Sequence, residues 1–87
     1  MSQNHQITVR YFASIREAVG QGSEPVQTAA ATLGDLRDEL IARGGAYASS
    51  LARGKAVRMA LNQLLCDDAA ALSAGAEVAF FPPVTGG

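Results

Sequence analysis

The chain has 87 residues, of which 48% are hydrophobic, and its formal net charge is −1 at pH 7. This length allows one small domain with one core, and the hydrophobic content excludes a disordered chain. The seven Lys and Arg residues are scattered, which excludes the clustered basic face of a nucleic-acid binder, and every apolar run is too short to span a bilayer.

The first predicted elements are a strand and a short helical turn. Residues 7–12 alternate between apolar and polar side chains, so Ile7, Val9 and Tyr11 share one face of a strand. Residues 13–19 carry apolar side chains at helical spacing and predict a turn of helix that packs against the core.

The main helix follows an edge strand. Residues 23–30 contain Pro25, which cannot donate a hydrogen bond to a neighbouring strand and therefore favours an edge position. Thr32 precedes Asp35 by three residues, the spacing of a helix start in which the threonine hydroxyl accepts from a backbone N–H. One stripe of this helix is apolar and faces the core: Leu33, Leu36, Leu40 and Ile41. Its charged side chains are expected to point to water: Arg37, Asp38, Glu39 and Arg43.

The second half of the chain predicts a further short helix and three strands. Gly44 and Gly45 are expected to end the main helix in the left-handed conformation. The elements that follow are a helical piece at 46–53, strands at 57–61, 64–66 and 77–81, a turn at Asn62-Gln63, and a loop at 67–75 that inserts Leu72 into the core. If Leu64 and Cys66 face the core, alternation points Leu65 outward.

This order of elements predicts an α+β fold of the β-grasp, or ubiquitin-like, type. Its mixed five-stranded sheet has the first and last strands side by side in the centre and is covered on one face by one main helix plus short helical turns. We expect a flexible N-terminal extension at residues 1–6, a single domain at residues 7–83, and an extended Gly-Gly tail at residues 84–87. The extension is polar and lacks the apolar stretch of an export signal, so we expect a cytoplasmic protein.

The body of the chain lacks the side-chain patterns of a catalytic or metal site. It has no phosphate-binding glycine loop, no paired metal-ligand spacing, and one histidine, His5, which lies in the predicted extension. The single cysteine, Cys66, excludes an internal disulfide and has no basic neighbour in sequence that would activate it. We therefore expect that the chain binds no metal or cofactor and is not an enzyme by itself.

The strongest functional signal is the terminal segment. Pro82 and Pro83 end the last strand and hold the chain extended, so we expect the four residues after them to project from the domain: Val84, Thr85, Gly86 and Gly87. A Gly-Gly end contributes little to stability, but it fits a channel too narrow for side chains. We expect the carboxylate of Gly87 to be the reactive group that this tail delivers into a partner.

An apolar patch is predicted beside this tail. Alternation in the last strand places Phe81 on the face opposite to the core, and the same reasoning exposes Phe12 and Leu65 on that face. Because a monomer rarely leaves such a patch uncovered, we predict that these three side chains, with Pro82 and Pro83, form a docking surface. The alternative is that a loop of the chain covers them.

These residues resemble the small, sulfur-carrying subunit of molybdopterin synthase, known as the MoaD family, from about residue 7 to residue 87. The most specific match is the terminal segment Glu-Val-Ala-Phe-Phe-Pro-Pro-Val-Thr-Gly-Gly at 77–87. The supporting matches are 9–13, 15–17, the helix start at 32–36, and Leu61-Asn62-Gln63.

The resemblance implies a β-grasp carrier without an active site of its own. In such carriers a ubiquitin-activating-type adenylyltransferase uses ATP to adenylate the terminal glycine, here Gly87, and sulfur then replaces the adenylate to give 1-thioglycine, a thiocarboxylate. The tail inserts into the large synthase subunit and gives sulfur to cyclic pyranopterin monophosphate. Two such transfers build the dithiolene of molybdopterin in molybdenum cofactor biosynthesis.

The resemblance also implies partners and contact residues. The family assembles as a heterotetramer of two small and two large subunits. By match of position, Phe12, Leu65 and Phe81 are the docking residues, in agreement with the strand alternation, and Arg10 and Arg16 are candidates to assist docking to the activating enzyme.

Three other functions fit the same terminal segment. A sulfur carrier of thiamin biosynthesis shares the fold, the Gly-Gly end and the activation chemistry, although the residues Phe80-Phe81-Pro82-Pro83 favour the molybdopterin branch. A ubiquitin-like protein modifier would be joined through Gly87 to lysines of other proteins. A plain interaction module would have an inert tail.

Overall fold

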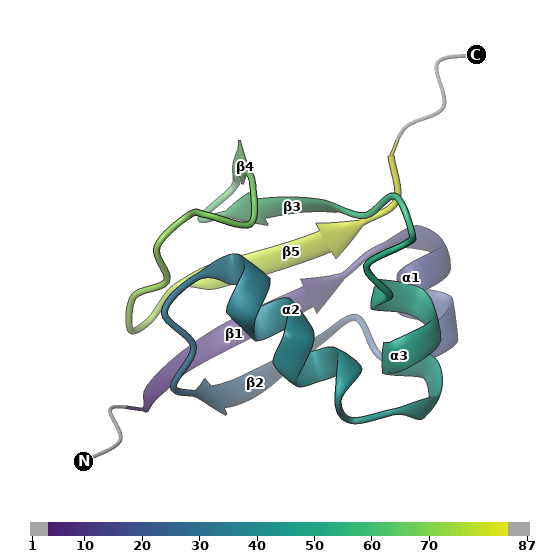
Figure 1. Cartoon of the computed structure of the whole chain (residues 1–87), viewed down its shortest axis with the longest axis horizontal. Helices are drawn as coiled ribbons and strands as arrows, with labels where there is room; N and C mark the ends of the chain where they lie inside the picture. The colour runs from purple at the N-terminus through teal and green to yellow at the C-terminus, as the bar shows by residue number, and fades with distance from the viewer. Residues whose placement is uncertain (1–3, 84–87) are drawn as a thin grey trace.

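The computed structural model describes residues 4–83, which form one mixed sheet with helices packed against it (Figure 1). The strands are β1 (His5–Tyr11), β2 (Ser23–Thr28), β3 (Arg58–Leu61), β4 (Leu64–Cys66) and β5 (Glu77–Phe81). The helices are α1 (Ala13–Val19), α2 (Leu33–Ile41) and α3 (Gly45–Leu51). The sheet order is β2-β1-β5-β3-β4, so the predicted α+β architecture with the first and last strands adjacent is confirmed.

The parallel pair of β1 and β5 forms the centre of the sheet and of the core. Val9 pairs with Val78 and Tyr11 with Phe80, and all four residues are at most 1% exposed. Because these residues alternate with solvent-facing ones in both strands, one face of the sheet is covered by α2 and the other is open. The predicted inward phase of both strands is confirmed.

Helix α2 starts as the sequence predicts. The Thr32 hydroxyl accepts a hydrogen bond from the Asp35 N–H at 3.2 Å, and the leucine stripe of the helix is buried in the core: Leu33, Leu36 and Leu40. The two glycines after the helix do not end it in the left-handed region, because Ala42 follows α2 in the right-handed conformation. Gly44 and Gly45, with φ of 80° and 57°, instead turn the chain into α3.

The prediction that the Arg37 side chain points to water is wrong. Its residue is only 5% exposed, and its guanidinium donates to main-chain carbonyl oxygens at the end of α3 and just beyond. The physical reason is that α3 packs alongside α2. Helical periodicity identifies the face toward the main core, but it does not reveal a second packing partner on the flank of the helix.

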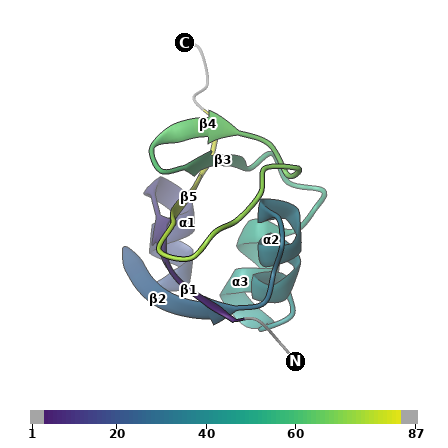
Figure 2. The same ribbon diagram turned by 90° about the vertical axis from the view of Figure 1, so that its left-hand side faces the viewer.

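Two further corrections concern the edges of the fold. His5 and Gln6, which were assigned to the N-terminal extension, belong to β1, where they pair with Thr28 and Gln27 of β2. Their polar side chains did not predict a strand, but backbone pairing does not depend on them. Leu64 does not face the core and is 72% exposed, because β4 is an edge strand outside the area that the helices cover (Figure 2).

A carboxylate cluster ties β1, β2 and the α2–α3 region together. Glu24 accepts hydrogen bonds from the hydroxyls of Tyr11 at 2.6 Å and Tyr47 at 2.8 Å, and from Arg43 Nη1 at 3.1 Å. Burial alone raises the pKa of Glu24, but these three donors outweigh it and hold the pKa below its ordinary value. Burial, together with the bond to Glu24, raises the pKa of Tyr11. The cluster therefore holds an ionised carboxylate beside the neutral phenol of Tyr11.

Candidate functional site

The open face of the sheet carries the predicted apolar patch. Phe12 is 38% exposed and its ring meets that of Phe81 edge to face, with centroids 6.5 Å apart and an interplanar angle of 87°. Leu65 is 70% exposed and lies two strands away from β5 on the same face, because it pairs with Ala60, which pairs with Ala79. We call Phe12, Phe81 and Leu65, with the two alanines between them, the outer-face patch. Within residues 4–83 no loop buries Phe12 or Leu65.

Charged side chains border this patch. The Arg10 guanidinium carbon lies 5.3 Å from the centroid of the Phe12 ring, and Arg10 Nη1 forms an ion pair of 3.0 Å with Glu77 Oε2. Arg58 pairs in register with Phe81 and is exposed. The structure therefore places Arg10 at the patch, where charges around an apolar centre favour orientation and fast association over raw affinity. Arg16 lies in α1, where its backbone N–H donates to the Phe12 carbonyl at 3.2 Å and its side chain lies against Gly22, just before β2.

The end of β5 adjoins the patch and leads into two half-buried prolines. Pro82 and Pro83 follow directly after Phe81, and Pro82 lines a cleft together with side chains of α1 and α3. Each proline lines one of two open clefts, of about 370 Å³ for Pro83 and about 410 Å³ for Pro82. The predicted tail residues Val84, Thr85, Gly86 and Gly87 lie outside the described residues.

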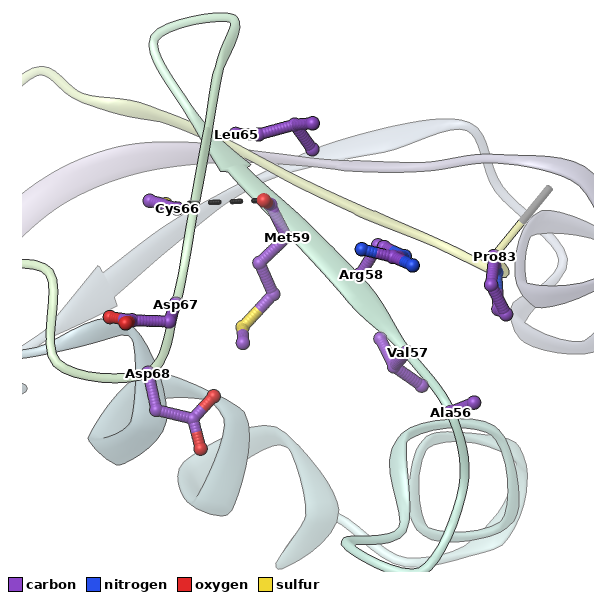
Figure 3. A pocket seen from close by; sticks show the side chains of 9 residues that line it. All are labelled: Ala56, Val57, Arg58, Met59, Leu65, Cys66, Asp67, Asp68 and Pro83. Atoms are coloured by element: carbon purple, nitrogen blue, oxygen red, sulfur yellow. Dashed lines mark hydrogen bonds between the residues drawn. The ribbon is translucent and has the colours of Figure 1, made fainter.

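The cleft beside Pro83 contains the single cysteine, a proximity that the sequence did not predict (Figure 3). Figure 3 shows Cys66 with Asp67 and Asp68 at one end of the cleft and Val57 and Pro83 at the other. Burial raises the pKa of the Cys66 thiol, and its sulfur lies 3.9 Å from the carbonyl oxygen of Met59. A thiol held in its protonated form is a poor nucleophile, so Cys66 is not an activated nucleophile in this cleft.

The remaining candidate groups do not come together. His5 is a half-buried residue at the start of β1, far along that strand from the outer-face patch, whose Phe12 follows its other end. Over the described part of the chain, no three or more His, Cys, Asp or Glu side chains gather in a group that could hold a metal ion. None of the helices within residues 4–83 has the length and apolar character needed to cross a membrane.

Comparison with known sequences identifies the family. The profile of the ThiS family matches residues 9–87. The chain belongs to the ThiS family. Two curated members are named molybdopterin synthase sulfur carrier subunit: the Escherichia coli protein is 42% identical and the Haemophilus influenzae protein 38%, each over 81 residues that cover 93% of this chain and 99% of the relative. The family resemblance that the terminal segment indicated is therefore confirmed.

Solved structures confirm the β-grasp fold of this ThiS family member. Subunits 1 and 2 of the molybdopterin-converting factor from Helicobacter pylori have been solved as a protein–protein complex, and one chain matches with a TM-score of 0.62 and 30% identity, covering 94% of this chain and 99% of that chain. The small archaeal modifier protein 1 of Haloferax volcanii matches with a TM-score of 0.75 and 26% identity, covering 92% of this chain and 99% of that chain.

Proposed function

We propose that this chain is the sulfur-carrier subunit of a molybdopterin synthase. The two curated relatives with that name support the proposal, and one observation on the structure carries it. The outer-face patch lies beside the end of β5, so a partner that covers Phe12, Phe81 and Leu65 also receives the chain that continues from Pro83. A carrier needs this arrangement, because docking of its body must deliver its terminus.

In this proposal the reactive group is the Gly87 carboxylate, and the chain itself is not catalytic. A carboxylate is ionised at neutral pH and resists nucleophiles, so it needs a better leaving group. Attack of the carboxylate on the α-phosphate of ATP releases pyrophosphate and forms an acyl adenylate. Sulfur at the oxidation level of sulfide then displaces AMP and leaves a thiocarboxylate, 1-thioglycine, at Gly87. Because activation consumes ATP on a ubiquitin-activating-type adenylyltransferase, we expect it to occur in the cytoplasm.

The proposed acceptor is cyclic pyranopterin monophosphate bound in a large synthase subunit. Four extended residues after Pro83 reach at most about 13–14 Å, which is enough to enter a cleft while the folded body stays outside. Ordering four residues costs about 4–8 kcal/mol of backbone entropy, and glycines offer few contacts to offset it. Burial of the outer-face patch is the proposed source of that free energy, with Pro82 and Pro83 at the rim of the interface. Two sulfur transfers complete one dithiolene.

The Helicobacter pylori complex supports a large-subunit partner for this chain, and we further propose an assembly of two small and two large subunits. The competing hypotheses are a carrier of thiamin biosynthesis and a protein modifier. The similarity to the small archaeal modifier protein 1, at 26% identity, supports the modifier hypothesis through sequence as well as fold. The names of both curated relatives favour the molybdopterin branch over either alternative.

The test removes Gly87 and follows binding and product separately. The truncated chain should bind the large subunit with unchanged affinity, because the outer-face patch is intact, and should support no molybdopterin. The full chain, incubated with the activating enzyme, ATP and a sulfur source, should gain the mass of one sulfur in place of one oxygen at Gly87 by intact mass spectrometry. Molybdopterin formation by the truncated chain contradicts the carrier role. Isopeptide adducts between Gly87 and lysines of other proteins, without sulfur transfer, would establish the modifier instead.

A further inference from the structure

The segment at 52–57 joins α3 to β3 and forms part of both clefts beside the prolines. Ala56 and Val57 line the cleft of Pro83 and also the cleft of Pro82, where Lys55 joins them. The segment is itself mostly exposed, and one turn hydrogen bond from Lys55 N to the Ala52 carbonyl, at 2.9 Å, lies within it. Its position therefore depends on contacts to the rest of the fold.

Arg37 of α2 provides one set of these contacts. Its Nε donates to the Leu51 carbonyl at 2.7 Å, and its Nη2 donates to the carbonyls of Ala52 at 2.7 Å and Lys55 at 3.2 Å. The residue is 5% exposed, so these hydrogen bonds form largely out of reach of water. A guanidinium that donates to carbonyls just past a helix C-terminus also faces the negative end of the helix dipole. Arg37 thus holds the start of the segment against α2.

Arg53 provides contacts in the opposite direction. It lies in the segment and donates from Nε to Asp38 Oδ1 at 2.9 Å and from Nη2 to the Gly34 carbonyl at 3.1 Å, both on α2. Its Nη1 pairs with Asp68, which lines the cleft of Pro83. We call Arg37 and Arg53, with the acceptors that they bind, the arginine clasp.

The charges of the clasp are balanced. Burial and the nearby Arg53 lower the pKa of Arg37, while Asp38 and Asp68 act against this shift. The hydrogen bond to Asp38 raises the pKa of Arg53. The carboxylates of Asp38 and Asp68 thus offset the repulsion between the two guanidinium groups.

We propose that Arg37 and Arg53 are positioning residues that set where the chain leaves the domain after Pro83. By holding residues 52–57, they fix one wall of the two clefts that Pro82 and Pro83 also line, and so steady the place from which the chain continues after Pro83. A fixed starting direction raises the fraction of docked carriers whose terminus enters the partner cleft. This inference rests on the proposed carrier function.

The test separates docking from delivery. The carrier variants Arg37→Met, Arg37→Lys and Arg53→Met are thiocarboxylated by intein cleavage with sulfide, which avoids the activating enzyme. Each is mixed with excess large subunit and cyclic pyranopterin monophosphate, and sulfur transfer is followed in a single turnover. We expect Arg37→Met and Arg53→Met to bind the large subunit within twofold of the wild type and to transfer sulfur at least fivefold more slowly. Arg37→Lys, which keeps a donor at the site, should recover part of the rate.

A matched control removes buried hydrogen bonds at the other end of the fold. Thr28 is 2% exposed, and its hydroxyl donates to Glu39 and accepts from the Ala30 N–H. It pairs with His5, at the end of β1 remote from Pro83. Thr28→Val should lower the melting temperature and leave the transfer rate unchanged.

The outcomes distinguish this inference from the proposed function. Unchanged transfer by folded Arg37→Met, or an equal slowing by Thr28→Val, overturns the positioning role. If Arg37→Met does not fold, the exposed Arg53→Met decides in the same way. A wild-type carrier that transfers no sulfur contradicts the proposed function instead.

Discussion

Leu64 and Leu65 allow the docking surface to be tested with an internal control. They are adjacent leucines with nearly equal exposure, 72% and 70%, on opposite faces of the same edge strand. Full burial of a leucine side chain is worth about 1.5–3 kcal/mol. Because about 70% of Leu65 is open in the free chain, its burial in a complex recovers about 1–2 kcal/mol, and we expect Leu65→Ala to weaken binding about 5–30-fold.

The assay is isothermal titration of each variant into the large subunit, with a thermal melt of each free carrier. Leu64→Ala should bind like the wild type, because its side chain lies off the outer-face patch. Both variants should stay within about 0.5 kcal/mol of wild-type stability, a shift of about 2–4 °C in melting temperature. An equal loss of affinity in the two variants, or a loss confined to Leu64→Ala, refutes the assignment of the docking face.

Three further changes test the site and the fold. Phe81→Ala should weaken partner binding by more than about 2 kcal/mol. It should also lower the stability of the free chain by about 0.5–1.5 kcal/mol, because the edge-to-face pair with Phe12 is lost. If the loss of binding free energy is no larger than the loss of stability, Phe81 is mainly a structural residue. Gln63→Gly should raise stability by about 0.5–1 kcal/mol in denaturant melts, since Gln63 has a φ of 71° in the β3–β4 turn, and a lower midpoint contradicts this. Glu24→Gln should destabilise the chain at neutral pH, because it removes a carboxylate whose pKa is lowered in the folded state. The loss of stability relative to the wild type should shrink as the pH falls from about 4.3 through that lower pKa, and a loss that does not change between about pH 7 and about pH 3 contradicts the ionised state.

The core of the sheet could be predicted because alternation is a local property. A strand that buries one face must place every second side chain inside, so Val9 and Tyr11, and likewise Val78 and Phe80, follow from the printed sequence. The start of α2 could be predicted for the same reason, since the Thr32 cap contacts a residue three positions away. The outward orientation of Phe12 and Leu65 follows from the same alternation, because they occupy positions between the inward-facing ones.

The errors occur where a residue's environment is made by segments distant in sequence. Arg37 is charged and lies off the leucine stripe, so periodicity assigns it to water; only the packing of α3 beside α2 supplies the carbonyls that bind it. Leu64 has the phase of a core residue but lies on an edge strand beyond the helices. His5 joins β1 because β2 extends far enough to pair with it.

The sequence by itself determined the periodic core, the capped helix and the terminal segment that identifies the family, because each is encoded in residues near one another along the chain. The tertiary structure decided that Phe12 and Phe81 meet, since their contact requires the parallel pairing of strands from opposite ends of the chain. It also decided that the arginine clasp holds residues 52–57, which share two clefts with Pro82 and Pro83. Contacts between distant segments depend on how whole elements pack, and no local pattern of residue types records that.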